Sequence, residues 1–426
     1  MTSIRKAYKT ILKEFFPENL TISFGDQELV FRKRMWTIAD SEGNQVHEGL
    51  RYGDNPDQMA AMYQWTSGDL KLGELKIKPG IPLVSGLSEK HFIQFGKHPG
   101  KTNLTDITAG LNIVKLTGDK PAVAIIKHNN PCGVAVSDSI LDSYQKAYYA
   151  DRIAAMGGCV VLSKSCDIET ARAISNSYSE VIVAPDYEEG SIEILSSRKN
   201  LRIIVMKEMF DFLKAPVEPS LRFTPTGDGG IIVELTQVPL ITSADDFIPA
   251  SHKYGGKTYD IKRLPDEREQ QDLLLAWHVA SGVTSNSIVM VKNGVTVAIG
   301  TGEQDRVGAV RLAVEKAYTK HADTICFNRT GKSLFQLELE VSKNLTPRSE
   351  LDDILEQTRE EKGGLTGAVI ASDGFFPFRD GVDTALNEGI TAVIQPGGSI
   401  NDYESIESCN EKNAAMVFTN QRVFRH

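Results

Sequence analysis

The chain has 426 residues, 41% of them apolar and 24% charged, with a formal net charge of −9 at pH 7. This composition is ordinary for a globular protein, and the length predicts two or three domains or subdomains. The acidic balance argues against a nucleic-acid or anionic-membrane partner. No apolar run is long enough to span a membrane, and the sequence lacks a secretory signal pattern. The five cysteines contain no C-x-x-C pair, which favours a reduced compartment. We therefore expect a cytoplasmic protein.

Turn residues and hydrophobic periodicity divide the chain into four segments. An N-terminal extension (1–49) precedes a first α/β unit (50–212), a Pro- and Gly-containing connecting arm (213–264) and a second α/β unit (265–426). In the first unit, predicted helices at 143–155, 169–175 and 191–197 alternate with strands at 159–162, 181–184 and 202–206. This alternation predicts a parallel or mixed sheet covered by helices.

The end of one strand carries the first candidate chemistry. A β-branched run at 122–126 predicts a buried strand, which is followed by Lys127-His128 and by an expected turn at Pro131-Cys132-Gly133. Lysine supplies a cation, and histidine is the side chain that most readily exchanges a proton near neutral pH. For an isolated Lys-His pair, however, a solvated turn is the more common arrangement. The pair Arg51-Tyr52 also has two interpretations: it could bind an anion, or its arginine could pair with a nearby carboxylate.

The second unit begins with a helix after Pro265. A hairpin is predicted from strands 287–291 and 295–299 around Asn293-Gly294. A Gly-rich segment, 300–306, leads into a helix for which Asp305 is the expected N-cap. Strands are expected at 367–372, 391–394 and 415–419. The strand-then-proline patterns at 181–185 and 392–396 suggest two structurally related halves.

Several segments together resemble one enzyme family. They are LRYGDNPDQ (50–58), IIKHNNPCGVAV (125–136), SNSIVMVKNGVTVAIGTGEQDRV (285–307), and SDGFFPFRDGVD (372–383) with AVIQPGGSIND (392–402). They resemble, in the same order, the transformylase part of the bifunctional AICAR transformylase/IMP cyclohydrolase family, and the resemblance runs from Leu50 to His426. Because only 49 residues precede Leu50, we expect a stand-alone transformylase, with IMP cyclohydrolase supplied by a separate polypeptide.

The resemblance implies formyl transfer from 10-formyltetrahydrofolate to the 5-amino group of AICAR, giving FAICAR in purine biosynthesis. It also implies tandem cytidine-deaminase-like α/β/α units and a homodimer with shared active sites. Neither a metal nor a prosthetic group is implied. The partners are AICAR and a reduced folate.

The resemblance also assigns roles to residues. Formyl transfer needs a base for the attacking amine and a cation for the oxyanion, roles that suit His128 and Lys127, and Asn286 matches an asparagine that bonds near the formyl oxygen. Arg51 and Arg422 match the phosphate site, and Asp380 and Glu180 match folate-side positions. The remaining matches to substrate-binding positions are Tyr52, Asn103, Arg306, Phe375 and Phe424.

Some positions depart from the family. Gly374 stands where alanine is usual, Asp57 where histidine is common, and the segment 327–364 is shortened, so an altered formyl donor such as formate with ATP stays open. A zinc deaminase needs H-x-E and P-C-x-x-C, whereas His128 is followed two residues later by Asn130 and no cysteine follows Cys132 at that spacing. A second alternative is a non-catalytic relative that binds a purine nucleotide or a folate.

Overall fold

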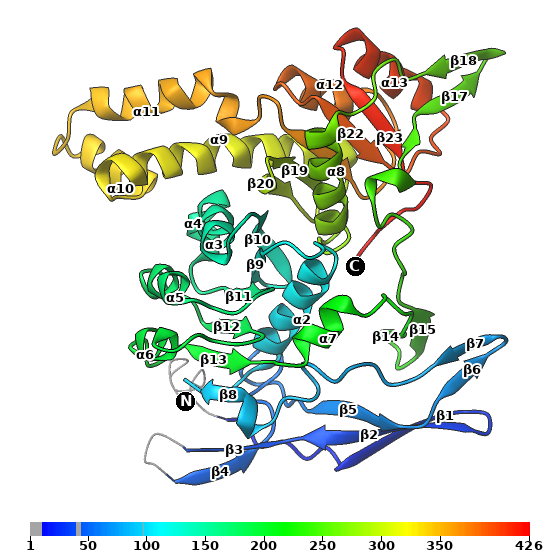
Figure 1. Cartoon of the computed structure of the whole chain (residues 1–426), viewed down its shortest axis with the longest axis vertical. Helices are drawn as coiled ribbons and strands as arrows, with labels where there is room; N and C mark the ends of the chain where they lie inside the picture. Colours follow the sequence, from blue (N-terminus) through cyan, green and yellow to red (C-terminus); the bar gives the residue numbers. More distant parts are fainter. Residues whose placement is uncertain (1–10, 40–43, 97) are drawn as a thin grey trace. The chain divides into compact units, whose positions relative to one another are not determined.

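The computed structural model describes residues 11–39, 44–96 and 98–426. The chain forms two compact units (Figure 1). Unit 1 comprises Met1–Leu111 and Cys159–Pro239, and unit 2 comprises Asn112–Gly158 and Leu240–His426. The first boundary between the two units, at Leu111 and Asn112, falls within helix α2 (Lys101–Lys115). Residues 1–10 and 40–43 of the expected N-terminal extension lie outside the described residues. The division of the chain into the four segments 1–49, 50–212, 213–264 and 265–426 remains a prediction.

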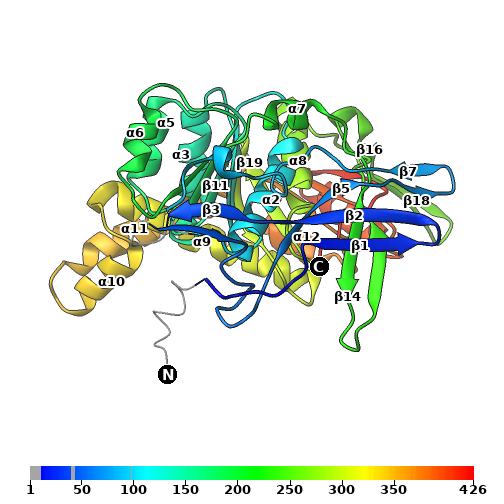
Figure 2. The same ribbon diagram turned by 90° about the horizontal axis from the view of Figure 1, so that it is seen from below.

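Unit 1 contains a buried parallel core and several antiparallel ribbons. Its parallel strands are runs of buried apolar side chains, as expected where both faces of a sheet are covered. The strands β1 and β2 form a long ribbon, clear in Figure 2, that β5 completes. The elements are β1 (Asn19–Phe24), β2 (Gln27–Arg34), β3 (Trp36–Ala39), β4 (Gln45–Glu48), β5 (Met62–Ser67), β6 (Leu70–Leu72), β7 (Leu75–Ile77), β8 (Phe92–Gln94), β11 (Cys159–Leu162), α5 (Ile168–Ser175), β12 (Val181–Ala184), α6 (Ser191–Ser196), β13 (Arg202–Val205), α7 (Met209–Lys214), β14 (Leu221–Pro225) and β15 (Ile231–Leu235).

Unit 2 is built on a mixed sheet with the strand order β16-β23-β22-β21-β19-β20-β10-β9. One hydrophobic core of this unit contains Ile288, Met290, Val310, Phe376 and Val393, all fully buried. The elements are β9 (Ala122–Lys127), β10 (Asn130–Val136), α3 (Ile140–Ala150), α4 (Arg152–Ala155), β16 (Ile248–Pro249), β17 (Ser251–Tyr254), β18 (Lys257–Asp260), α8 (Glu267–Ala280), β19 (Ile288–Lys292), β20 (Val295–Gly300), α9 (Arg306–Thr330), α10 (Leu334–Ser342), α11 (Arg348–Glu360), β21 (Val369–Ser372), α12 (Asp380–Asn387), β22 (Ala392–Gln395), α13 (Asp402–Glu411) and β23 (Ala415–Phe418).

The predicted α/β class is confirmed, and the element order along the chain repeats. A helix, a β-hairpin, a helical segment and three strands joined by helices occur first from α2 to β13 and again from α8 to β23. In each half the last three strands are parallel. The faint repeat in the sequence therefore corresponds to two similar successions of elements. In the second half, α9 continues into α10 and α11, drawn yellow to orange in Figure 1.

Two local predictions were wrong. The expected turn at Pro131-Cys132-Gly133 is part of strand β10, which has an irregular register there, and the chain turns instead at His128-Asn129. Both turn residues have positive φ, 53° and 61°, as the two central residues of a tight type I′ hairpin require. The helix expected at 143–155 is broken at Asp151, which ends α3 and caps α4 by accepting a hydrogen bond from Ala154 N at 2.9 Å.

Candidate active site

The predicted site residues fall into two groups, one in each compact unit. Arg51, Tyr52, Asn103 and Glu180 lie in unit 1. The group in unit 2 consists of Lys127, His128, Asn286, Arg306, Phe375, Asp380, Arg422 and Phe424.

In unit 1, a buried arginine and a tyrosine form one cluster. Arg51 and Tyr52 are each 8% exposed, and Nη2 of Arg51 donates to Oη of Tyr52 at 2.9 Å. The guanidinium carbon lies 4.6 Å from the centroid of the tyrosine ring. Nε of Arg51 is buried and has no hydrogen-bond partner among the described residues. A buried cation with an unused donor is suited to an anionic ligand.

Asn103 and Glu180 also lie together. Nδ2 of Asn103 donates to Oε2 of Glu180 at 3.1 Å, while Oδ1 accepts from Gly100 N at 3.2 Å. Because α2 begins at Lys101, Asn103 belongs to the first turn of this helix. Arg202, which sequence reasoning missed, is 2% exposed and its Nη1 lies 3.9 Å from Oε2 of Glu180. Burial, assisted by the charge of Arg51, lowers the pKa of Arg202 to about 10.

In unit 2, Lys127 and His128 lie at the end of strand β9 and in the turn that follows it. Both line a cavity of about 180 Å³, together with Asn130 and Cys132 of strand β10. Nζ of Lys127 donates to Met156 O at 2.8 Å. The turn is held in place because Nη1 of Arg425 donates to Asn129 O at 2.6 Å, and Oδ1 of Asn130 accepts from Thr284 N at 2.9 Å. The Lys-His pair is therefore fixed at the wall of a cavity.

Asn286 and Arg306 form a second cluster in unit 2. Nη2 of Arg306 donates to Oδ1 of Asn286 at 2.7 Å, and Nη1 contacts Oδ1 of Asp373. Asp373 is fully buried and accepts hydrogen bonds from Oγ of Ser285 at 2.6 Å and from Ser287 N at 3.0 Å. Sequence reasoning did not assign Asp373, although a carboxylate directly after the buried strand β21 was an available signal.

The C-terminal residues lie against this cluster. The guanidinium carbon of Arg422 is 4.3 Å from the ring centroid of Phe424, and that of Arg306 is 6.0 Å from it. Gly374 makes this packing feasible, because a Cβ there would lie 2.7 Å from both Arg306 Nη2 and Phe424 Cε1. The structure thus brings together Asn286, Arg306, Arg422 and Phe424.

Two predicted residues stand further from these contacts. Phe375 is 42% exposed beside Gly374. Asp380 is exposed at the first residue of α12, where its Oδ1 accepts from Gly381 N at 2.8 Å. Among the described residues we find no hydrogen bond from Asp380 to the other predicted site residues.

The described residues contain no group of three or more His, Cys, Asp or Glu side chains arranged to hold a metal ion. In the part of the chain that the structure describes, no helix combines the length and apolar character needed to cross a membrane.

The structure is that of a mixed α/β protein in which a buried arginine cluster and a Lys-His pair at a cavity are the candidate functional groups. Residues 6–316 match the model of the family described as AICARFT/IMPCHase bienzyme, so the chain belongs to this family.

Similar proteins named "Bifunctional purine biosynthesis protein PurH" occur in several bacteria. The protein of Synechococcus elongatus is 35% identical over 88% of this chain and 59% of its own length. The protein of Aquifex aeolicus is 32% identical over 98% and 65%, and that of Halalkalibacterium halodurans is 32% identical over 99% and 65%. The chain thus spans about three fifths of the length of these relatives.

Proposed function

We propose that the chain transfers a formyl group from 10-formyltetrahydrofolate to the 5-amino group of AICAR, giving FAICAR in purine biosynthesis. Family membership supports the substrates. The observation that carries the proposal is the placement of Lys127 and His128 together at the wall of a cavity. Formyl transfer changes no oxidation state, so the proposal includes no redox cofactor.

In the proposed mechanism, His128 removes a proton from the amine as its nitrogen attacks the formyl carbon. General acid–base catalysis of this kind contributes about 10²–10⁴-fold to a rate. Lys127 stabilises the oxyanion of the tetrahedral intermediate and provides a proton to the departing folate nitrogen. The amine of AICAR is a weak nucleophile, because its lone pair is delocalised into the ring, which is why a positioned base is needed.

Asn286 has the geometry to orient the formyl group. Its Oδ1 is occupied by Arg306, and its Nδ2 donates to Glu303 O at 2.9 Å. An amide nitrogen has two N–H donors, so one is left to bond the formyl oxygen. Arg306 thereby fixes which end of the amide faces the substrate.

We assign the remaining groups from the family resemblance. Arg51 and Arg422 would bind the phosphate of AICAR, with Tyr52, Asn103, Arg306, Phe375 and Phe424 around the nucleotide. Glu180 and Asp380 would bind the folate. The proposal extends to tandem cytidine-deaminase-like units and to a homodimer in which each active site is completed by the partner chain.

A purified-enzyme assay tests this function. The chain is mixed with AICAR and 10-formyltetrahydrofolate, and release of tetrahydrofolate and formation of FAICAR are followed. A parallel reaction supplies formate and ATP as the donor. We expect turnover with the folate and formation of FAICAR. Turnover only with formate and ATP would show that formate, and not the folate, is the formyl donor. Binding of AICAR without turnover in either reaction would favour a non-catalytic relative.

A further inference from the structure

The far wall of the cavity beside the β9–β10 turn carries two further lysines that the proposed mechanism does not use. Lys316 and Lys320 lie one turn apart on α9, and both line the cavity with Lys127. The only carboxylate among the lining residues is that of Asp151. The lining residues thus include three lysines and one carboxylate, and the cavity has an excess of positive charge.

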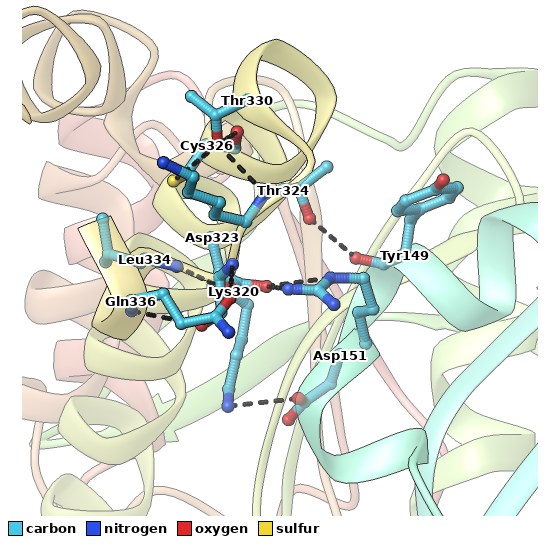
Figure 3. A network of polar contacts seen from close by, with 12 residues as sticks. Tyr149, Asp151, Lys320, Asp323, Thr324, Cys326, Thr330, Leu334 and Gln336 are labelled. Carbon is cyan, nitrogen blue, oxygen red and sulfur yellow. Dashed lines mark hydrogen bonds and ion pairs between the residues drawn. The ribbon is translucent and has the colours of Figure 1, made fainter. Parts of the chain in front are cut away.

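The existing contacts leave most of this charge uncompensated. Nζ of Lys320 lies 3.1 Å from Oδ1 of Asp151, as Figure 3 shows. Lys127 and Lys316 instead donate to neutral carbonyl oxygens, those of Met156 at 2.8 Å and Ile299 at 3.0 Å. Within the described residues, neither ammonium forms an ion pair. Since each ammonium has three donors, both retain unused N–H groups.

The charged side chains next to the lining residues, Arg152 and Asp323, already pair with each other. Arg152 follows Asp151 in the chain, but its guanidinium donates to Oδ2 of Asp323 at 2.8 Å. The second oxygen of Asp323 accepts from Leu334 N at 2.9 Å. This carboxylate therefore neutralises Arg152 and is not available to the cavity lysines.

We infer that this cavity binds an oxyanion, of the carboxylate or phosphate class, between Lys127, Lys316 and Lys320. A volume of about 180 Å³ suits a single small oxyanion or the acidic end of a larger ligand. Burial lowers the pKa of Lys316, an effect that the charge of Asp151 opposes and the charge of Lys320 reinforces. A bound anion would offset the effect of burial. One source of the anion is the glutamate carboxylate of a reduced folate, which rests on the proposed function and which Lys316 and Lys320 would hold while Lys127 serves the formyl group. The other is a free small acid or inorganic phosphate.

Cys132 makes the charge of this cavity measurable. It is half-buried and lines the cavity, whereas Cys159, Cys166, Cys326 and Cys409 are buried. The full chain is alkylated with iodoacetate, which is anionic, and separately with iodoacetamide, which is neutral, and labelling of Cys132 is timed by peptide mass. We expect the rate with iodoacetate, divided by the rate with iodoacetamide, to be about tenfold higher in the folded chain than in the unfolded chain, because cations attract the anionic reagent.

Matched variants test the assignment of the charge. The double variant Lys316→Gln, Lys320→Gln should lose this preference, Lys316→Arg should keep it, and the distant exposed Lys343→Gln should leave it unchanged. An unchanged ratio in the double variant would overturn the inference. If neither reagent labels the folded chain, equilibrium dialysis with labelled formate and labelled phosphate decides: binding that the double variant loses supports the site, and absence of binding overturns it.

Ligand protection distinguishes the sources. Protection of Cys132 by 5-formyltetrahydrofolate, but not by 5-formyltetrahydropteroate, would identify the glutamate carboxylate, while protection by formate or inorganic phosphate alone would identify a free anion. These readouts need no turnover. A charge-selective cavity in a chain without formyl transfer would refute the proposed function alone, and an active chain without charge selectivity would refute the oxyanion site alone.

Discussion

Nη2 of Arg306 donates a 2.7 Å hydrogen bond to Oδ1 of Asn286, and this bond sets the direction of the amide. The same guanidinium contacts the fully buried Asp373, which also holds Ser285 and Ser287 on either side of Asn286. One carboxylate therefore positions both the arginine and the segment that carries the asparagine. We regard Asp373 as a positioning residue.

The variant Asp373→Asn tests this arrangement. It keeps the shape of the side chain but leaves the buried Arg306 without its anion, and removing one partner of a buried ion pair costs about 3–5 kcal/mol. We expect a loss of this size in the free energy of unfolding, measured by urea titration, and a rise in KM for AICAR. Asp352→Asn is the control, because Asp352 pairs with Arg348 at an exposed site and contributes little. Equal effects of the two variants would contradict the assigned role.

Gly374 provides a second prediction, because alanine at this position would place its Cβ 2.7 Å from Phe424 Cε1. We expect Gly374→Ala to destabilise the chain by about 1–3 kcal/mol through overpacking. In the double variant Gly374→Ala, Phe424→Leu, the smaller leucine should restore part of the lost stability. A double-mutant cycle measured by thermal unfolding should therefore give a coupling energy of about 1 kcal/mol. Strict additivity would show that Phe424 does not lie against Gly374.

Deleting Asn420–His426 removes Arg422 and Phe424 and also Arg425, whose Nη1 holds the β9–β10 turn through Asn129 O. We expect KM for AICAR to rise at least tenfold and kcat to fall, because the deletion removes both the proposed phosphate-binding arginine and a support of the turn that carries the proposed catalytic pair. Arg422→Ala alone should raise KM with a smaller change in kcat. If the truncated chain has wild-type kinetics, the C-terminal residues do not belong to the site.

His278 gives a pH-dependent prediction. It is 4% exposed, its Nε2 lies 3.0 Å from Ile241 O, and burial lowers its pKa below the ordinary value. Below the ordinary histidine pKa the unfolded chain binds the proton more readily, so stability should fall as pH decreases, by up to about 1.4 kcal/mol per pH unit. His278→Gln should flatten this dependence between pH 7 and 5, as followed by thermal unfolding, whereas the exposed His47→Gln should not.

Local sequence patterns predicted much of the fold but not the long-range contacts. The runs 181–184 and 392–394 are short, apolar and bounded by turn residues, so the strands predicted at 181–184 and 391–394 followed from hydrophobicity alone. Asn293-Gly294 likewise identified its hairpin. The turn at His128-Asn129 was misplaced, because proline and glycine are stronger local turn signals than a histidine with positive φ.

The residues of the candidate site also divide into those that local motifs predicted and those that depend on long-range contacts. Lys127, His128, Asn286 and Arg306 were selected from motifs, whereas Arg202, Asp373, Lys316 and Lys320 were missed. Their roles depend on partners far along the chain: Asp373 contacts a residue 67 positions away, and Lys320 pairs with Asp151 across α9 and α4. A single sequence without its fold does not identify such pairs.

The central claim is that Lys127 and His128 carry out formyl transfer. The most direct measurement is the rate of FAICAR formation from AICAR and 10-formyltetrahydrofolate by Lys127→Ala, His128→Ala and the wild type. Binding of AICAR, measured by calorimetry, is compared on the same samples. We predict that each variant loses at least 10²-fold in kcat, in keeping with general acid–base catalysis, while AICAR binding stays within about threefold. A variant lacking both side chains that retains near wild-type turnover would contradict the account.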